Sequence, residues 1–531
     1  MRESTFLADF VRNAAYRSAD AIAIVSGSSI LSYGELATAT DAFASGLIAL
    51  GLRRADRVGI YLDKRFETVI ASFGAPAAGA VFVPINPLLK PSQVGYILAD
   101  CNVLVLVTTG ERAALLSPML VHCSDLRHLV IIGAMPDGLS VPGVAVHTWD
   151  EVLAAAPRAP HRVIDTDMVA ILYTSGSTGR PKGVVLSHRN MVAGAKSVAS
   201  YLENGPQDVI LAALPLSFDA GFSQLTTACH AGARVVLINY LLPMDVLNAI
   251  ERERVTGLTA VPPLWIQLSQ LAWPVTITEH LRYIANTGGR MPLACLSILR
   301  KQLPKTRPFL MYGLTEAFRS TCLPPEQVDR RPDSIGKAIP NAEILVLRDD
   351  GTECAADEPG ELVHRGALVS MGYWNDAAKT AERYRLLPQR ASGLVLPEIA
   401  VFSGDNVRRD VEGYLYFIGR RDEMIKTSGY RVSPTELEEV LYSSGLTGET
   451  AAFGVPHPML GEAIVVVVTP KDDGNWLSAD ALVKLCRAQL PAYMVPAHVD
   501  VRPGPLPRNP NGKIDRKTLS AEFAAHFEEG R

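Results

Sequence analysis

The chain has 531 residues, of which 48% are hydrophobic and 20% charged, so it can bury large cores and is not a disordered protein. Its formal net charge is −4, which excludes a global basic field that would recruit nucleic acid or an anionic membrane. At about 150 residues per domain, this length favours two to four domains.

The N-terminus predicts a packed helix. Phe6, Phe10 and Ala14 fall on one helical face with charged residues between them, so we expect an amphipathic helix and no signal peptide. No apolar run approaches the roughly 18 residues of a transmembrane helix, so we expect no membrane span. The seven cysteines are widely spaced, without the CxxC pattern of zinc sites. They indicate reduced thiols and a cytoplasmic protein.

From about residue 20 to residue 400, short β-rich runs alternate with helical patterns. Alternation of this kind is typical of an α/β fold with mostly parallel sheets. The runs that we expect to be strands are ADRVGIYL, AGAVFVPI, VLVLVTT, LRHLVIIG, MVAILYT, ARVVLIN and GLTAVPP, and we expect helices over 33–50, 190–202 and 244–254. The polar, proline-containing stretch over 375–400 is expected to be surface structure.

After residue 419 the pattern restarts with its own elements: two short β-rich runs, a helix from Pro434, the strand AIVVVVTP and a helix from Ser478. We therefore expect a large N-terminal domain of several subdomains over 1–419. A joint follows at 420–422, and a small α+β C-terminal domain covers 423–531.

The strongest local motif is YTSGSTGRPKG at 173–183, directly after the apolar run MVAIL. Glycines let backbone N–H groups turn inward, hydroxyl groups donate hydrogen bonds, and Lys182 supplies a positive charge, as a phosphate-binding loop requires. It is not a Walker A loop, because Gly183 and not Ser or Thr follows the lysine.

Five further motifs follow in the chain: YGLTE at 312–316, SGD at 403–405, GRRD at 419–422, SGYR at 428–431 and NGKID at 511–515. Together with the phosphate loop they resemble the AMP-forming adenylate superfamily. That superfamily includes acyl-CoA synthetases, the adenylation domains of nonribosomal peptide synthetases, and luciferases. The resemblance covers nearly the whole chain and is strongest to acyl-CoA ligases associated with bacterial exosortase gene clusters.

This resemblance implies a reaction in two halves. A carboxylate attacks the α-phosphate of ATP, which carries Mg²⁺, to give an acyl-adenylate and pyrophosphate, and a thiol then displaces AMP. Catalysis would consist of positioning and charge stabilisation, with little covalent chemistry by the protein.

The resemblance also assigns nucleotide contacts. The β- and γ-phosphates would be held by the loop residues Thr174, Ser175, Gly176, Ser177, Thr178, Gly179 and Lys182. At the adenine, Tyr312 would stack on the base beside Gly313, opposite Gly288 and Gly289. Asp405 would accept hydrogen bonds from the ribose hydroxyls, and Arg420 would lie beside Asp405. Thr315 would bond the α-phosphate, and Glu316 would hold Mg²⁺. The catalytic set would be Lys182, Thr315, Glu316 and Lys513.

By the same resemblance, Lys513 of the small domain bridges the carboxylate and the α-phosphate. The small domain would be mobile, with Asp422 as the hinge on which it rotates between the half-reactions. Gly429 and Arg431 would face the thiol tunnel in the second conformation.

The acid pocket is expected to include Phe218, Asp219, Ser223, Met311 and Arg319. In LPLSFDAG at 214–221, Phe-Asp stands where many fatty acyl-CoA ligases have a histidine-bearing motif. An aspartate there either pairs with the ammonium of an amino-acid substrate or bonds local backbone or a neighbouring basic group. Arg319 either binds a second carboxylate in this pocket or forms a surface ion pair, and we favour the surface ion pair.

The closing NGKIDRK is more similar to peptide-synthetase adenylation domains than to acyl-CoA ligases. The thiol would then come from the phosphopantetheine of a carrier protein in trans, or from free CoA. Two other functions are less well supported. Nothing in the sequence indicates luciferase-like light chemistry, and a non-catalytic nucleotide-binding scaffold would not require Lys182, Glu316, Asp405 and Lys513 together.

Overall fold

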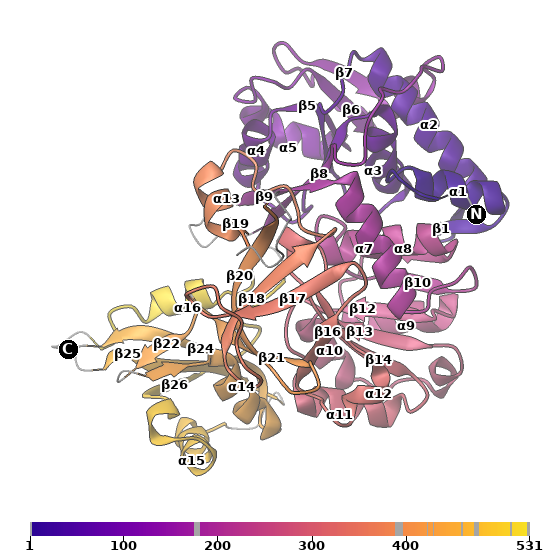
Figure 1. The fold of residues 1–531 in the computed structure, drawn as a ribbon. Coiled ribbons are helices and arrows are strands. Elements are labelled where there is room, and N and C mark those ends of the chain that lie inside the picture. Colours follow the sequence, from indigo (N-terminus) through magenta and orange to yellow (C-terminus); the bar gives the residue numbers. More distant parts are fainter. Residues whose placement is uncertain are drawn as a thin grey trace.

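The computed structural model describes residues 3–174, 181–387, 397–421, 423–427, 430–457, 460–471, 477–509 and 512–527. Two large sheets and their helices form the N-terminal part, and a smaller sheet forms the C-terminal part at one side of it (Figure 1). None of the described helices is long and apolar enough to cross a membrane.

The first sheet has seven strands and lies in the upper part of Figure 1. In spatial order its strands are β7 (Ala145–Thr148), β6 (His128–Ile132), β5 (Val103–Thr109), β3 (Arg57–Tyr61), β4 (Val81–Pro84), β8 (Met168–Thr174) and β9 (Lys182–Ser187). All pairs are parallel except the β8–β9 pair, which is antiparallel. The helices along this part of the chain are α1 (Asp9–Arg17), α2 (Tyr33–Ala49), α3 (Phe66–Ala78), α4 (Pro91–Asp100), α5 (Gly110–Leu120) and α6 (Trp149–Leu153).

The second sheet has fourteen strands. Its path is β17 (Ala342–Leu347), β18 (Gly360–Gly366), β20 (Ile399–Arg409), β21 (Leu415–Arg420), β16 (Ser334–Ala338), β15 (Thr321–Leu323), β14 (Arg307–Tyr312), β13 (Tyr283–Asn286), β12 (Gly257–Ala260), β10 (Val209–Ala212), β11 (Arg234–Leu237), β1 (Ile22–Ser26) and β2 (Ser29–Ser32), with β19 (Tyr384–Leu386) beside β20. The pairs from β1 through β11, β10, β12 and β13 to β14 are parallel, whereas the strands after β14 pair antiparallel. The expected parallel arrangement therefore covers one half of this sheet, because hairpins replace helical crossovers after Tyr312.

The helices of this second part are α7 (His188–Tyr201), α8 (Asp219–Ala231), α9 (Pro243–Glu253), α10 (Pro262–Ser269), α11 (Leu293–Gln302), α12 (Pro325–Val328) and α13 (Ala377–Arg383), with short 3-10 turns η1 (Val275–Glu279) and η2 (Thr315–Ala317). The three helices expected over 33–50, 190–202 and 244–254 correspond to α2, α7 and α9, and each of the seven expected strand runs contains a strand.

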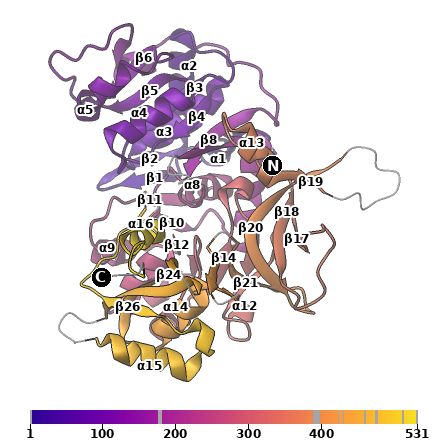
Figure 2. The same ribbon diagram turned by 90° about the vertical axis from the view of Figure 1, so that its left-hand side faces the viewer.

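The small C-terminal part is an α+β unit. Its sheet contains β23 (Tyr430–Val432), β22 (Ile425–Thr427), β25 (Gly461–Pro470), β24 (Thr447–His457) and β26 (His498–Val501), and its helices are α14 (Pro434–Ser443), α15 (Ala479–Gln489), α16 (Arg516–Glu522) and the 3-10 turn η3 (Ala492–Met494). Figure 2 shows this unit packed below the first sheet, against the second. The Leu293 N–H donates to Glu439 Oε1 at 3.1 Å across this interface.

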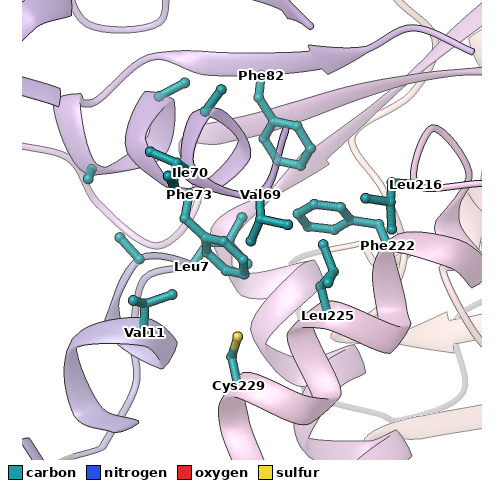
Figure 3. Packing of buried hydrophobic residues seen from close by; sticks show 14 of the residues in the cluster. Leu7, Val11, Val69, Ile70, Phe73, Phe82, Leu216, Phe222, Leu225 and Cys229 are labelled. Atoms are coloured by element: carbon teal, nitrogen blue, oxygen red, sulfur yellow. The ribbon is translucent and has the colours of Figure 1, made fainter. Parts of the chain in front are cut away.

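The main core joins the two large sheets. Phe222 of α8 packs against Phe82 of β4, with ring centroids 4.8 Å apart, and against Phe73 of α3 at 5.9 Å. Figure 3 shows these rings with Leu225 and Cys229 of α8 facing the helix that carries Val69 and Phe73. All of these side chains are buried, so α8 is fixed along one face, and its other residues are available for a site.

Candidate active site

The phosphate loop connects two paired strands. Thr174 ends β8 and Lys182 begins β9, and the two residues are register partners. Ser175, Gly176, Ser177, Thr178 and Gly179 lie outside the described residues. The Lys182 ammonium stands 5.7 Å from the ring centroid of Tyr373. Burial lowers the pKa of Lys182, and the positive charge of Lys379 adds to this effect.

Tyr373 also binds the residue expected to hold Mg²⁺. Its hydroxyl donates to Glu316 Oε1 at 2.6 Å, and the Ser370 N–H donates to the Glu316 carbonyl at 2.9 Å. Glu316 and Thr315 lie together in η2, directly after β14. Tyr373 thus connects Lys182 with Glu316, and the sequence reasoning missed it. The GYWN stretch that carries it, at 372–375, leads into the stretch 375–400 that was expected to be surface structure.

Asp405 is held in place but keeps one oxygen free of hydrogen bonds. The Tyr312 hydroxyl donates to Asp405 Oδ2 at 2.5 Å, while Oδ1 is buried without a hydrogen-bond partner and lies 3.6 Å from Arg420. Burial raises the pKa of Asp405. A buried carboxylate oxygen without a hydrogen bond suits a ligand with hydroxyl donors, so these residues fit the ribose of ATP.

The three glycines expected near the adenine each have another residue close to their backbone. Gly288 has φ +75°, and a Cβ there would lie 3.1 Å from Val261 Cγ1. A Cβ at Gly289 would lie 3.1 Å from Pro262 Cγ, and one at Gly313 would lie 3.1 Å from the Arg319 Cα. Side chains larger than hydrogen would crowd these neighbours, which is a packing reason for glycine at the three positions.

Lys513 reaches this region from the small domain. Its Cε lies 3.8 Å from the position that a Gly288 Cβ would occupy. One side of Lys513 is open to solvent, yet the surrounding protein lowers the pKa of its ammonium by desolvation. The charges of Asp219, Glu423 and Asp405 act in the opposite direction. The structure therefore brings Lys513 close to Gly288, where the charges of Asp405 and Asp219 act on it.

Asp219 begins α8, directly after Phe218, and is held by a buried ion pair. Arg319 Nη1 donates to Asp219 Oδ2 at 2.8 Å and to the Phe318 carbonyl at 2.9 Å. Arg319 is 2% exposed, so the expectation of a surface ion pair is wrong. Phe318 adopts φ +56° and is fully buried against α7, and this turn directs the next side chain, Arg319, inward.

A narrow cavity lies beside this ion pair. Its wall is formed by Arg319, by Ser223 and Thr227 of α8, and by Met311 and Tyr283, with Val198 and Leu202 of α7 among the apolar lining residues. It holds about 10 Å³, room for about one water molecule. Ser223, Met311 and Arg319 were expected here, whereas Thr227 was not, because helical spacing alone does not distinguish it from a core residue.

The remaining expected residues concern the rotation of the small domain. Asp422 and Gly429 lie outside the described residues. Arg431 lies in β23, and its side chain is likewise outside the described part. Among the residues that the structure describes, no three His, Cys, Asp or Glu side chains come together as a metal site.

The chain matches the AMP-binding enzyme family over residues 11–374 and the AMP-binding enzyme C-terminal domain over 436–513. It belongs to this family of adenylate-forming enzymes. Like its relatives, it is an AMP-forming acid–thiol ligase that acts through an acyl-adenylate.

The relatives differ in their acids and acceptors. An L-proline–[L-prolyl-carrier protein] ligase of Streptomyces coelicolor is 33% identical, over 93% of each chain. A long-chain-fatty-acid–CoA ligase of Yersinia pestis is 30% identical, over 97% of this chain and 94% of its own. The o-succinylbenzoate coenzyme A synthetase of Bacillus subtilis, in complex with ATP and a magnesium ion, matches with a TM-score of 0.79, 27% identity, and 96% and 98% coverage.

Proposed function

We propose that this ligase activates a small amino acid with ATP and Mg²⁺ and transfers it to the phosphopantetheine thiol of a separate carrier protein, acting in the cytoplasm. The observation that carries the proposal is the position of Asp219, whose partner Arg319 lines the narrow cavity described above, hereafter the acid cavity, and whose charge acts on Lys513. Arg319 occupies only Oδ2, and no hydrogen bond to Oδ1 is present among the described residues. A substrate ammonium has an acceptor at Oδ1.

Three further points support this proposal. The cavity has room for about one water molecule, so it can take a single polar group at the end of a short side chain but not a long acyl chain, which would need an extended apolar channel. The relative from Streptomyces coelicolor loads an amino acid onto a carrier protein. The NGKID motif and the resemblance to exosortase-associated ligases favour a carrier over CoA.

In the first half-reaction, the chain's own groups neutralise charge and position the reactants. Lys513 would offset the repulsion between the acid and the α-phosphate, and Lys182 would act at the β- and γ-phosphates. Thr315 would bond the α-phosphate, and Glu316 would contribute one oxygen to the Mg²⁺ that ATP brings. Asp405 Oδ1 would accept the ribose hydroxyls. The small domain would then rotate at Asp422, bringing Gly429 and Arg431 to the thiol.

A second candidate is a plain fatty or aryl acyl-CoA ligase. The Arg319–Asp219 ion pair favours it, because a carboxylate that is already paired needs no ammonium from the substrate. In this case Asp219 has a structural role only.

ATP–pyrophosphate exchange with a panel of amino, fatty and aryl acids tests the proposal. We expect exchange with a small amino acid, lost in Asp219→Ala and in the milder Asp219→Asn. Asp208→Ala serves as the matched control, because it removes a carboxylate from another arginine pair, Arg282–Asp208 at 2.8 Å, outside the cavity. Exchange only with unsubstituted acids, unchanged in the Asp219 variants, would contradict the proposal and establish the second candidate. A product with CoA but none with a phosphopantetheine-loaded carrier would contradict the proposed acceptor.

A further inference from the structure

Two buried polar side chains in the wall of the acid cavity have atoms without a partner. Arg319 Nε and Thr227 Oγ1 are both buried and make no hydrogen bond to any described residue. The two residues are each 2% exposed. Because buried polar groups in folded proteins are almost always bonded, two such atoms on residues that line one cavity indicate a polar occupant, which is a water molecule or a polar group of the substrate.

The two atoms differ in what they can do. The guanidinium Nε is a donor only, whereas the threonine hydroxyl can donate or accept. Arg319 Nη1 is already engaged with Asp219 and with the Phe318 carbonyl, so its Nε is the buried donor that remains free. The occupant must therefore offer an acceptor to Nε, and the Thr227 hydroxyl can bond a donor or an acceptor of the occupant.

The ion pair also restricts the charge of this acceptor. A carboxylate bonded to Nε would share one guanidinium with Asp219, and two neighbouring anions in a buried site repel each other. A carbonyl, hydroxyl or amide oxygen bonds Nε without that repulsion. Arg319 is thus unsuited to a second carboxylate of the substrate.

We propose that Arg319 and Thr227 select an acid whose far end carries a neutral hydrogen-bond acceptor, and that they discriminate against the hydrocarbon isostere. This inference rests on the proposed function, because it takes the cavity as the site of the substrate's side chain. It goes further by naming the chemistry at the end of that side chain.

Isosteric ligand pairs test this selection directly. Threonine and valine differ by a hydroxyl in place of a methyl group, as do 3-hydroxybutanoate and 3-methylbutanoate if the substrate is not an amino acid. We expect the member with the hydroxyl to be preferred by at least about tenfold in exchange. Acyl-sulfamoyl-adenosine mimics of the same pairs, titrated by calorimetry, give a binding readout that does not depend on turnover.

Thr227→Val isolates the contribution of the hydroxyl without changing the shape of the side chain. We expect it to reduce the preference about three- to tenfold, since one hydrogen bond to the ligand is lost. Thr40→Val is the matched control, because Thr40 in α2 is fully buried and its Oγ1 also has no partner, but it lies outside the cavity. Its preference ratio should equal that of the parent protein.

The outcomes separate the inference from the proposed function. Equal affinity for the two members of each pair, with no effect of Thr227→Val, would overturn the inference alone and indicate that one water molecule satisfies both atoms. Selection within the hydroxy acid pair but no exchange with any amino acid would keep the inference and contradict the amino-acid substrate. If none of the acyl-sulfamoyl-adenosine mimics binds, both the inference and the proposed function are wrong.

Discussion

The nucleotide side of the active site and the acid cavity are built in different ways. On the nucleotide side, tyrosine hydroxyls hold both carboxylates: Tyr312 donates to Asp405, and Tyr373 donates to Glu316, which leaves one buried acceptor, Asp405 Oδ1, without a partner. In the acid cavity, Arg319 and Thr227 keep atoms without partners. In the first arrangement each carboxylate is fixed by a tyrosine, and the one free atom is an acceptor. In the second, a free donor and a free hydroxyl lie on residues that line a cavity, so on our proposal the substrate completes the bonding there and specificity arises in this region.

The largest effect is expected where the two regions meet, at Lys513. Lys513→Ala should reduce adenylation at least about a hundredfold, because a cation that offsets two reacting anions acts mainly in the transition state. Formation of the thioester from supplied acyl-adenylate should be nearly unchanged. Single-turnover assays of each half-reaction measure both effects. Loss of both halves would show that Lys513 is required for structure and not specifically for adenylation.

A large change in stability is expected from breaking the ion pair in the acid cavity. Asp219→Ala leaves the guanidinium of Arg319 buried without its counter-ion, and the free energy of unfolding should fall by about 3–5 kcal/mol. The double variant Asp219→Ala/Arg319→Met should recover most of this loss, because no buried charge remains. Chemical denaturation of the parent protein, Asp219→Ala and the double variant measures their free energies of unfolding. A double variant no more stable than Asp219→Ala would show that the pair contributes little beyond packing.

On the nucleotide side we expect Asp405→Asn to increase the stability of the protein and to weaken the binding of ATP. Burial raises the pKa of Asp405, so the ionised form is less favourable in the folded chain than in the unfolded chain. The neutral amide removes this cost, and the ligand-free variant should melt at a higher temperature at neutral pH. Its KM for ATP should rise about tenfold, since the acceptor for the ribose hydroxyls is weakened. The KM for the acid should stay constant, and a parallel rise in it would contradict the separation of the two regions.

This contrast also explains what the sequence could predict. Short contiguous motifs carry the family resemblance, so Lys182, Tyr312, Glu316, Asp405 and Lys513 could be predicted as site residues from the sequence, and their roles stay predictions. Arg319 was expected on the surface, because its burial depends on the positive φ of Phe318, which no residue pattern indicates. Thr227 and Tyr373 act through contacts made by distant segments. The parallel strands followed from the alternation of elements, whereas the antiparallel half of the second sheet is built from hairpins that alternation does not reveal.

The smallest effect is expected at a position that links the two large sheets. Lys64 lies between β3 and α3, and its ammonium donates to the carbonyls of Ala212, Ala213 and Ile238, each at 2.8 Å. Ala212 and Ala213 lead into the loop that carries Phe218 and Asp219, so Lys64 positions the acid side and not the nucleotide side. Lys64→Met should raise the KM for the acid about threefold, since three carbonyls lose their donor, with the KM for ATP unchanged.

The difference in stability between the parent protein and Lys64→Met should depend on pH. Burial lowers the pKa of Lys64 to about 7, so between about 7 and the value near 10.5 of the unfolded chain, the unfolded state binds more protons. The free energy of unfolding of the parent protein should therefore rise with pH relative to that of Lys64→Met over this range. Denaturation of both proteins at pH 6.5, 7.5 and 8.5 measures this difference. A difference that stays constant with pH would show that Lys64 keeps an ordinary pKa. In the kinetic experiment, a rise in the KM for ATP equal to the rise in the KM for the acid would show that Lys64 affects the whole site.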